Sequence, residues 1–279
     1  MGITVGRSRR TVLVTATAAL TLSGFALGVT RGATGSTAAG TAAPGTVVVQ
    51  EDEHSKVLTA DSSVRDKQQL VDEVHRQRRE EQTRPTEPTP DPTDGGTSGG
   101  TTGGDTGGGD GGGHGDQNGF PVRDEWLDSS ATGKATPAGG DRGRIAAAGA
   151  SFVKVPFMEY YAIFTATSSD VSWLGERPFD ADSIQHTDTW NVGSVGAPFL
   201  VIGAPKGADV KSTGASAEAS WSTTVRDNWY SEHAHDQVAF YPPDQEDYSN
   251  VFRISHSVTG TFQFGSSFYT VTSRDRAYS

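Results

Sequence analysis

The sequence predicts an all-β domain, an antiparallel β-sandwich or jelly roll, with a closed β-barrel as the alternative. Two long stretches in the C-terminal half alternate between apolar and polar residues with a period of two, as in a strand that buries one face. Turns rich in Gly, Pro and Asp separate these stretches from further short strand candidates. No segment of this region shows the 3.6-residue apolar spacing of an amphipathic helix.

The longest alternation covers residues 215–230 and predicts a single strand. Its odd positions include Ala217, Ala219 and Trp221, and we expect them to face a neighbouring sheet. Its even positions are polar or aromatic and should face outward. These outward residues are Ser216, Glu218, Ser220, Ser222, Thr224, Arg226, Asn228 and Tyr230.

The second alternation, over residues 252–264, ends at Gly265-Ser266-Ser267, and the chain then enters the apolar stretch 268–272. A short glycine-containing turn between two alternating runs indicates a β-hairpin. The remaining strand candidates are residues 145–155, 157–167, 184–192, 199–203 and 237–241. The stretch 157–167 is apolar on both faces, which predicts a central position in its sheet.

Residues 1–45 have the pattern of an export signal. Arg7, Arg9 and Arg10 precede an uncharged run over residues 11–30, and small residues follow. Residues 8–13 (SRRTVL) resemble a twin-arginine signal. We expect a secreted protein or one at the extracytoplasmic surface; the alternative is an uncleaved signal that anchors the chain as a single pass.

Two segments between the signal and the predicted domain have the composition of a spacer. Residues 46–84 are charged and have few large apolar residues, which predicts a solvated, partly helical stalk. Residues 85–119 begin with prolines, and 14 of the 25 residues from 95 to 119 are glycine, which predicts a disordered linker. The all-β domain is therefore expected over residues 120–279.

Charge and cysteine content exclude several classes of protein. The net charge is −11, and residues 120–279 carry 12 basic and 19 acidic residues with no basic stripe, so we expect no nucleic-acid partner. A membrane partner is expected only through an uncleaved N-terminal segment. The absence of cysteine excludes disulfides, thiol catalysis and Cys-ligated zinc.

Four residues have the spacing of metal ligands. His233 and His235 would lie on one face of a strand, and His186 and Asp188 repeat that spacing elsewhere. The pattern predicts a zinc or copper site if the two pairs meet; the alternative is that these residues face water. His256 lies on the apolar face of its strand, which is typical of a hydrogen-bonded core histidine.

Two acidic loops offer oxygen ligands for calcium. One contains Asp180 and Asp182, and the other contains Asp244, Glu246 and Asp247. Neither fits the twelve-residue pattern of an EF-hand. We expect no cofactor, with calcium at these loops or zinc at the histidines as the alternatives.

Aromatic residues provide the candidate ligand-binding surface. Adjacent aromatics on a strand must point to opposite faces, so Tyr230 and one of Tyr160 and Tyr161 are candidates for exposure. Together with Arg226 they would form a platform for sugar rings or for a partner protein. The alternative is that they pack against a neighbouring strand or loop.

These observations predict an exported, non-catalytic binding module held on a flexible spacer. The expected ligand is a glycan, a wall polymer or a protein. No Gly-x-Ser-x-Gly elbow that could hold a nucleophile occurs in residues 120–279, where the domain is expected. The first alternative is an extracellular metal-dependent enzyme that uses His233 and His235. The second is a signal-anchored ectodomain with a structural or sensory role.

Overall fold

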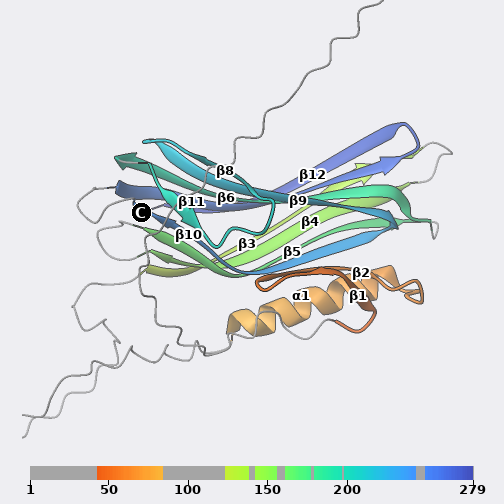
Figure 1. The fold of residues 1–279 in the computed structure, drawn as a ribbon. Helices are drawn as coiled ribbons and strands as arrows, with labels where there is room; N and C mark the ends of the chain where they lie inside the picture. The colour runs from red at the N-terminus through yellow and green to blue at the C-terminus, as the bar shows by residue number, and fades with distance from the viewer. Residues whose placement is uncertain are drawn as a thin grey trace, which may run out of the picture. The chain divides into compact units, whose positions relative to one another are not determined.

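The chain forms a β-sandwich. A computed structural model describes residues 43–83, 123–137, 142–155, 161–176, 179–196, 198–242 and 249–278. Twelve strands in these ranges form two antiparallel sheets that face each other, and a helix lies against the outer side of one sheet (Figure 1). Both sheets are open, so the predicted sandwich is confirmed and the chain does not form a closed barrel.

The larger sheet, sheet A, has seven strands. In order across the sheet they are β1 (Thr46–Glu51), β2 (Ser55–Ala60), β10 (Tyr230–Tyr241), β5 (Ala162–Gly175), β4 (Gly143–Val155) and β3 (Arg123–Ala135). The seventh strand, β7 (Leu200–Ile202), pairs with the end of β10 at Ala239–Tyr241. The stretch 157–167, predicted to be central, contributes to β5, which lies between β10 and β4.

The smaller sheet, sheet B, has five strands. In order they are β12 (Ser267–Tyr278), β11 (Ser249–Phe264), β6 (Ala181–Gly196), β9 (Ser216–Asn228) and β8 (Asp209–Ser212). The predicted hairpin joins β11 to β12. Gly265 occupies the first central position of its two-residue turn with φ of +59°, where a side chain would be strained.

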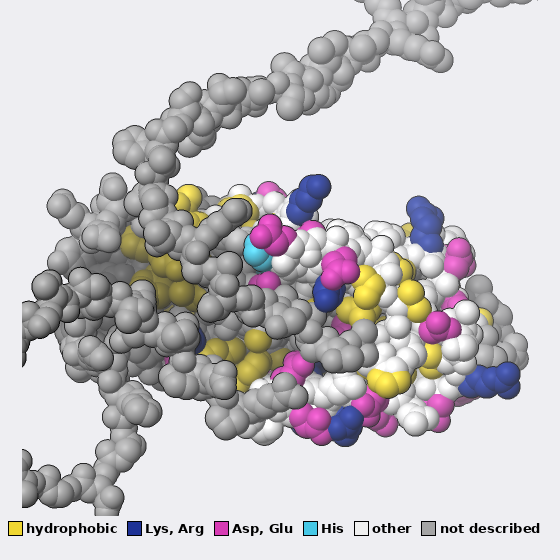
Figure 2. Space-filling view, turned by 60° about the horizontal axis from the view of Figure 1, so that its bottom comes forward, with side chains coloured by type: hydrophobic (Ala, Val, Ile, Leu, Met, Phe, Trp, Pro, Cys, Tyr) yellow, Lys and Arg dark blue, Asp and Glu magenta, His cyan; other side chains and the backbone are white. Residues whose placement is uncertain are grey.

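The surface mixes both signs of charge. Figure 2 shows the side of the molecule that faces downward in Figure 1, where acidic and basic side chains lie close together with small hydrophobic groups between them. Among the side chains coloured in this view there is no continuous basic stripe.

The structure corrects the prediction of a solvated stalk over residues 46–84. β2 pairs with β10 over Ser55–Thr59, so the β1–β2 hairpin extends sheet A. Val57, Leu58 and Thr59 are buried in that position. The folded domain therefore includes residues well before 120, because β10 offers a free edge that these apolar residues can cover.

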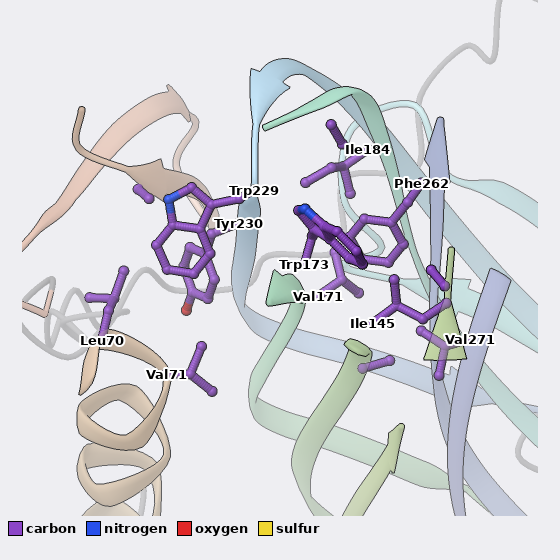
Figure 3. Packing of buried hydrophobic residues seen from close by; sticks show 14 of the residues in the cluster. Leu70, Val71, Ile145, Val171, Trp173, Ile184, Trp229, Tyr230, Phe262 and Val271 are labelled. Atoms are coloured by element: carbon purple, nitrogen blue, oxygen red, sulfur yellow. The ribbon is translucent and has the colours of Figure 1, made fainter. Parts of the chain in front are cut away.

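The helix α1 (Lys67–Thr83) packs on the outer face of sheet A. Leu70, Val71 and Val74 are buried, and they belong to the same apolar cluster as Trp229 and Tyr230 (Figure 3). Three apolar residues cannot hold an isolated helix in water. Sheet A supplies the missing surface, so this helix is stable only in its docked position.

One long side of the sandwich is fastened by contacts between β3 and β12. The Ser129 and Ser273 hydroxyls are 3.1 Å apart, and the Asp128 amide donates to the Asp275 carboxylate at 2.8 Å. Further along, the Tyr269 hydroxyl donates to the carbonyl of Thr136 at 2.5 Å. These hydrogen bonds join an edge of sheet A to an edge of sheet B.

The buried apolar residues form two clusters rather than one. Along β6, Ile184 belongs to the first cluster and Trp190 and Val192 belong to the second. Between them, His186 and Asp188 face the interior and are fully buried. β4, β5 and β11 also carry buried polar residues between residues of the first cluster and residues of the second. A polar band therefore separates the two apolar halves of the core.

Two parts of the predicted organisation lie outside the described residues. They are the export segment, apart from its last three residues, and the linker over residues 85–119. Within the described ranges, no helix has both the length and the apolar character needed to cross a bilayer.

The pairing of β2 with β10 predicts that a fragment covering residues 120–279 is less stable than the full chain. Removing β1, β2 and α1 exposes the edge of β10 and uncovers Trp229 and Tyr230. We expect the fragment to melt at least ~10 °C lower or to aggregate. Thermal melts followed by circular dichroism provide the measurement. Equal melting temperatures would show that the N-terminal elements contribute nothing to the fold.

Candidate functional site

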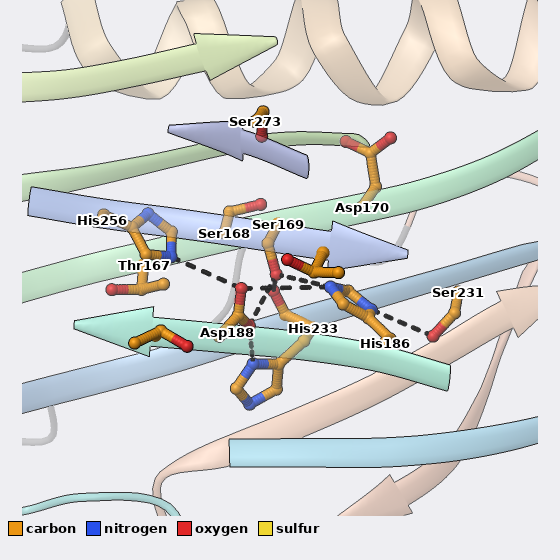
Figure 4. A network of polar contacts seen from close by, with 12 residues as sticks. Thr167, Ser168, Ser169, Asp170, His186, Asp188, Ser231, His233, His256 and Ser273 are labelled. Atoms are coloured by element: carbon orange, nitrogen blue, oxygen red, sulfur yellow. Dashed lines mark hydrogen bonds and ion pairs between the residues drawn. The ribbon is translucent and has the colours of Figure 1, made fainter. Parts of the chain in front are cut away.

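A buried carboxylate surrounded by three histidines occupies the polar band. β6 carries His186 and Asp188, β10 carries His233, and β11 carries His256. All four side chains are at most 1% exposed. They meet because each lies on the inward face of its strand, where the two sheets oppose one another (Figure 4).

Asp188 is the centre of the cluster. Its Oδ2 lies 2.5 Å from His233 Nδ1 and accepts a hydrogen bond from Ser169 Oγ at 2.7 Å. Its Oδ1 lies 3.4 Å from His256 Nε2 and 4.0 Å from His186 Nε2. The three imidazoles thus approach the carboxylate from different sides (Figure 4).

Hydroxyl groups hold the histidine rings in place. His186 Nδ1 lies 3.1 Å from Ser231 Oγ, and its Nε2 lies 3.0 Å from Ser169 Oγ. His256 Nδ1 lies 3.1 Å from Ser151 Oγ. Each of these serines is fully buried on sheet A, so the hydrogen bonds also connect the two sheets.

Two tryptophans pack on the imidazoles. Trp221 stacks on His233 with ring centroids 3.7 Å apart, and Trp190 stacks on His256 with an angle of 7° between the rings. Gly149 of β4 faces the same region. A Cβ there would clash with Val258 Cγ2 and lie 3.0 Å from His256 Cε1, so glycine leaves the space that the His256 ring needs.

The charge of the cluster follows from these contacts. Burial alone would raise the pKa of Asp188, but the hydrogen bond from His233 and the adjacent His256 hold that pKa well below its usual range. Burial lowers the pKa of His186 to about 4. At neutral pH the site therefore contains an ionised Asp188 beside a neutral His186.

The structure brings together three of the four predicted metal ligands. His186, Asp188 and His233 share the cluster, whereas His235 Nε2 lies 2.8 Å from the Gly203 carbonyl and 3.0 Å from the Gln237 carbonyl. Within the described ranges, no three His, Cys, Asp or Glu side chains are arranged so that they could share one ion. The carboxylate lies between the rings, so a metal site in this cluster stays a prediction.

The predicted ligand-binding platform is not assembled. Asp227 adopts φ of +50°, β9 ends at Asn228, and the chain crosses to sheet A, where Tyr230 begins β10. Tyr230 is fully buried, while Arg226 is exposed on β9. The prediction of one strand with both residues on its outer face is wrong, because a residue with positive φ interrupts the alternation.

Of the other two predicted binding residues, the structure describes Tyr161. Tyr161 is half-buried and packs against Tyr241, with ring centroids 5.3 Å apart. Tyr160 lies outside the described residues.

The first acidic loop takes part in the fold. Asp180 lies 3.3 Å from the Lys67 ammonium, and Asp182 accepts a hydrogen bond from the Gly265 amide at 2.5 Å. Asp244, Glu246 and Asp247 lie outside the described residues. Calcium binding at either loop stays a prediction.

A second buried polar group, which the sequence did not reveal, fastens α1 to sheet A. Arg78 donates to Asp170 at 2.7 Å, and His75 Nε2 lies 3.1 Å from the same carboxylate oxygen. On the neighbouring strand the Tyr230 hydroxyl donates to Glu232 at 2.9 Å. Burial raises the pKa of Glu232 to about 7, and Asp170, its cross-strand neighbour, adds to that increase.

The outer edge of sheet A carries an exposed apolar strand. Val47, Val48 and Val49 of β1 are 43%, 41% and 55% exposed. β1 pairs with β2 on one side, and no described strand pairs with its other side. A bulge between Val48 and Gln50 leaves Val49 without a partner on β2.

Comparisons of the chain with protein-family models, with curated proteins and with solved structures gave no match.

β4 approaches the histidine–aspartate cluster closely at Gly149, so we expect Gly149→Ala to disturb the cluster. The new methyl group must displace Val258 and His256, and we expect a loss of roughly 1–3 kcal/mol in the free energy of unfolding. A change in tryptophan fluorescence should accompany the loss, because His256 stacks on Trp190. Denaturant unfolding measures the first effect. Gly133→Ala on edge strand β3, where the nearest contact is 3.2 Å, is the control and should cost less.

The raised pKa of Glu232 predicts a pH-dependent effect of Glu232→Gln. In the folded chain this carboxyl has a pKa of about 7, against an ordinary value of 4.5, so its contribution to stability is present below pH 4.5 and is lost as the pH rises to about 7. Glutamine stays neutral throughout. We expect the variant to exceed the wild type by on the order of 1–3 kcal/mol at pH 8 and to match it near pH 4.

Denaturant unfolding across this pH range tests the effect of Glu232→Gln. His186 contributes equally to the pH dependence of stability in the wild type and in the variant. Only the difference between the two stability profiles is therefore interpreted. Glu53→Gln, on the exposed turn between β1 and β2, serves as the control. A difference that is the same at pH 4 and pH 8 would contradict the prediction.

Proposed function

We propose that this chain is an exported, non-catalytic binding module whose ligand is a polypeptide segment that pairs with β1. The unpaired, valine-rich edge of sheet A carries this proposal. An edge strand presents free backbone N–H and C=O groups, and an extended segment of another chain can satisfy them by adding a strand.

Natural edge strands are commonly protected by charged side chains or proline, because exposed edges promote unwanted association. The central residues of β1 are three consecutive valines, and its one charged residue, Glu51, lies at the end. An apolar edge of this kind costs solubility, which supports a functional reason for its exposure.

The separation of Tyr230 from Arg226 favours a protein ligand over a glycan or wall polymer. The glycan hypothesis rested on these two residues forming one exposed platform, and Tyr230 is buried. Main-chain pairing at β1 needs no aromatic platform. The mixed charge of the face in Figure 2 and the net charge of −11 also disfavour nucleic acid.

The burial of the histidine–aspartate cluster favours a binding module over the metal-dependent enzyme. Asp188, His186 and His233 are fully buried, so a substrate has no direct contact with their reactive atoms. A catalytic group must come within hydrogen-bond reach of the atoms that react. The cluster is better explained as a polar connection between the two sheets.

Export remains part of the proposal and rests on the sequence. Arg7, Arg9 and Arg10 before an uncharged run indicate a signal. The glycine-rich residues 95–119 connect α1 to β3, so along the chain they lie within the folded domain and do not separate it from the signal. Cleavage of the signal gives a secreted protein, and its retention gives an anchored one. Either location leaves β1 outside the cytoplasm.

Selection from a random-peptide phage library on immobilised full-length protein tests the proposal. We expect enrichment of extended peptides rich in β-branched and aromatic residues, which pair best with an edge strand. Binding of the selected peptides should fall at least ~10-fold in the variant Val47→Lys/Val49→Lys, because charge blocks an edge. Fluorescence anisotropy with the labelled peptides gives the affinities.

The control for this experiment is Val210→Lys. Val210 is 46% exposed on β8, the edge strand of sheet B, so it matches the test positions in residue type and exposure. Peptide binding should be unchanged in this variant. The absence of enriched peptides, or peptides that bind the β1 variant equally well, would refute the proposed function.

A further inference from the structure

The edge of β1 is complementary to itself. An antiparallel pair of two β1 strands centred on Val48 places Val47 of each copy opposite Val49 of the other, and Thr46 opposite Gln50. All six valines of the two strands then lie within one continuous contact. No other antiparallel register of the two strands pairs every valine with a valine.

The charge of β1 favours the same arrangement. Glu51 is the only charged residue of the strand, and it forms an ion pair with Lys56 at 3.1 Å. Antiparallel pairing about Val48 keeps the two Glu51 carboxylates at opposite ends of the contact. Parallel pairing would place them side by side, where like charges are destabilising.

The other described edges lack this property. β8 carries Asp209 and Lys211, and β3 and β12 contact each other along one side of the sandwich. β7 is apolar but has three residues, which gives few backbone hydrogen bonds. Among the described strands, β1 combines adequate length with an uncharged centre.

The bulge in β1 adds to the surface available for pairing. Val49 has no partner on β2 and is the most exposed of the three valines at 55%. Its side chain gains contacts only when another strand covers the edge. The contact remains small for a protein interface, so the expected association is weak and depends on concentration.

We propose that the partner of β1 is a second copy of this chain, paired antiparallel about a two-fold axis through Val48. This inference rests on the proposed function, because it names the polypeptide that β1 binds. The two copies form one continuous sheet through their A sheets, with the same residues contributed by each side. Where the N-terminal signal is retained, it fixes the chains to one surface and raises their effective concentration, which allows pairing despite modest affinity.

Sedimentation equilibrium of the full chain between about 1 and 200 µM provides the first test. We expect a reversible monomer–dimer equilibrium that Val47→Lys/Val49→Lys shifts at least ~10-fold toward monomer. Val210→Lys should leave the equilibrium unchanged, and circular dichroism melts establish that all variants are folded. A wild-type chain that stays monomeric at 200 µM, or a dimer insensitive to the β1 variant, overturns the inference.

A cysteine crosslink provides the second test, since the natural chain contains no cysteine. In the proposed dimer the two copies of Val48 lie directly opposite each other. Directly opposed residues on antiparallel strands have Cα atoms about 4.5–5.5 Å apart, so the variant Val48→Cys can form a disulfide between the copies. Mild oxidation should give a disulfide-linked dimer much faster than in Val210→Cys. Equal rates for the two variants overturn the two-fold arrangement.

The two proposals fail in different ways. If the chain is monomeric but captures library peptides through β1, the module binds another polypeptide and only the self-pairing is wrong. If the chain neither associates nor captures peptides through β1, both proposals fail.

Discussion

The ionised carboxylate of Asp188 has no access to water, and the centre of the sandwich is built around it. A buried charge is costly unless hydrogen-bond donors and a compensating environment surround it. His233 and Ser169 donate to it directly, and His256 lies against its second oxygen. These donors come from β5, β10 and β11, so the charge at β6 is stable only when both sheets are assembled around it.

The hydrogen bonds around Asp188 also fix how the two sheets face each other. Apolar side chains tolerate small sliding movements, whereas a histidine held by Ser231 or Ser151 has one suitable position. Shifting a strand by one residue would move His186 and Asp188 to the solvent face and leave the serines unpaired. We regard the polar band as the element that specifies the register, while the two apolar clusters supply most of the stabilisation.

The sequence allowed the fold class to be predicted, because β9 and β11 alternate cleanly over most of their length. It also suggested His186, Asp188 and His233 as members of one site, since residues two apart on a strand share a face. Their partners on β5 escaped prediction. Serines in the interior mask the apolar alternation, and Ala166 with φ of +48° shifts the inward face from Ala162 and Phe164 to Thr167 and Ser169.

The helical part of residues 46–84 was predicted, but its docking and the two strands were not. β1, β2 and α1 are polar or short, and their stability depends on contacts with residues more than a hundred positions away. Local propensity gives no information about the free edge of β10. Tyr230 was misplaced in the same way, because the change of sheet after Asp227 depends on one backbone conformation that the alternation conceals.

The hydrogen bonds between β3 and β12, which form a seam along one side of the sandwich, restrain the two sheets more at that edge than at the opposite edge. Side-chain and main-chain hydrogen bonds tie the sheets together along that side, at Ser129, Asp128 and Tyr269. This seam makes the sandwich most resistant to opening on its β3–β12 side. We expect local opening, and with it the exchange of backbone amides with deuterium, to begin at the edge that carries β1 rather than along the seam.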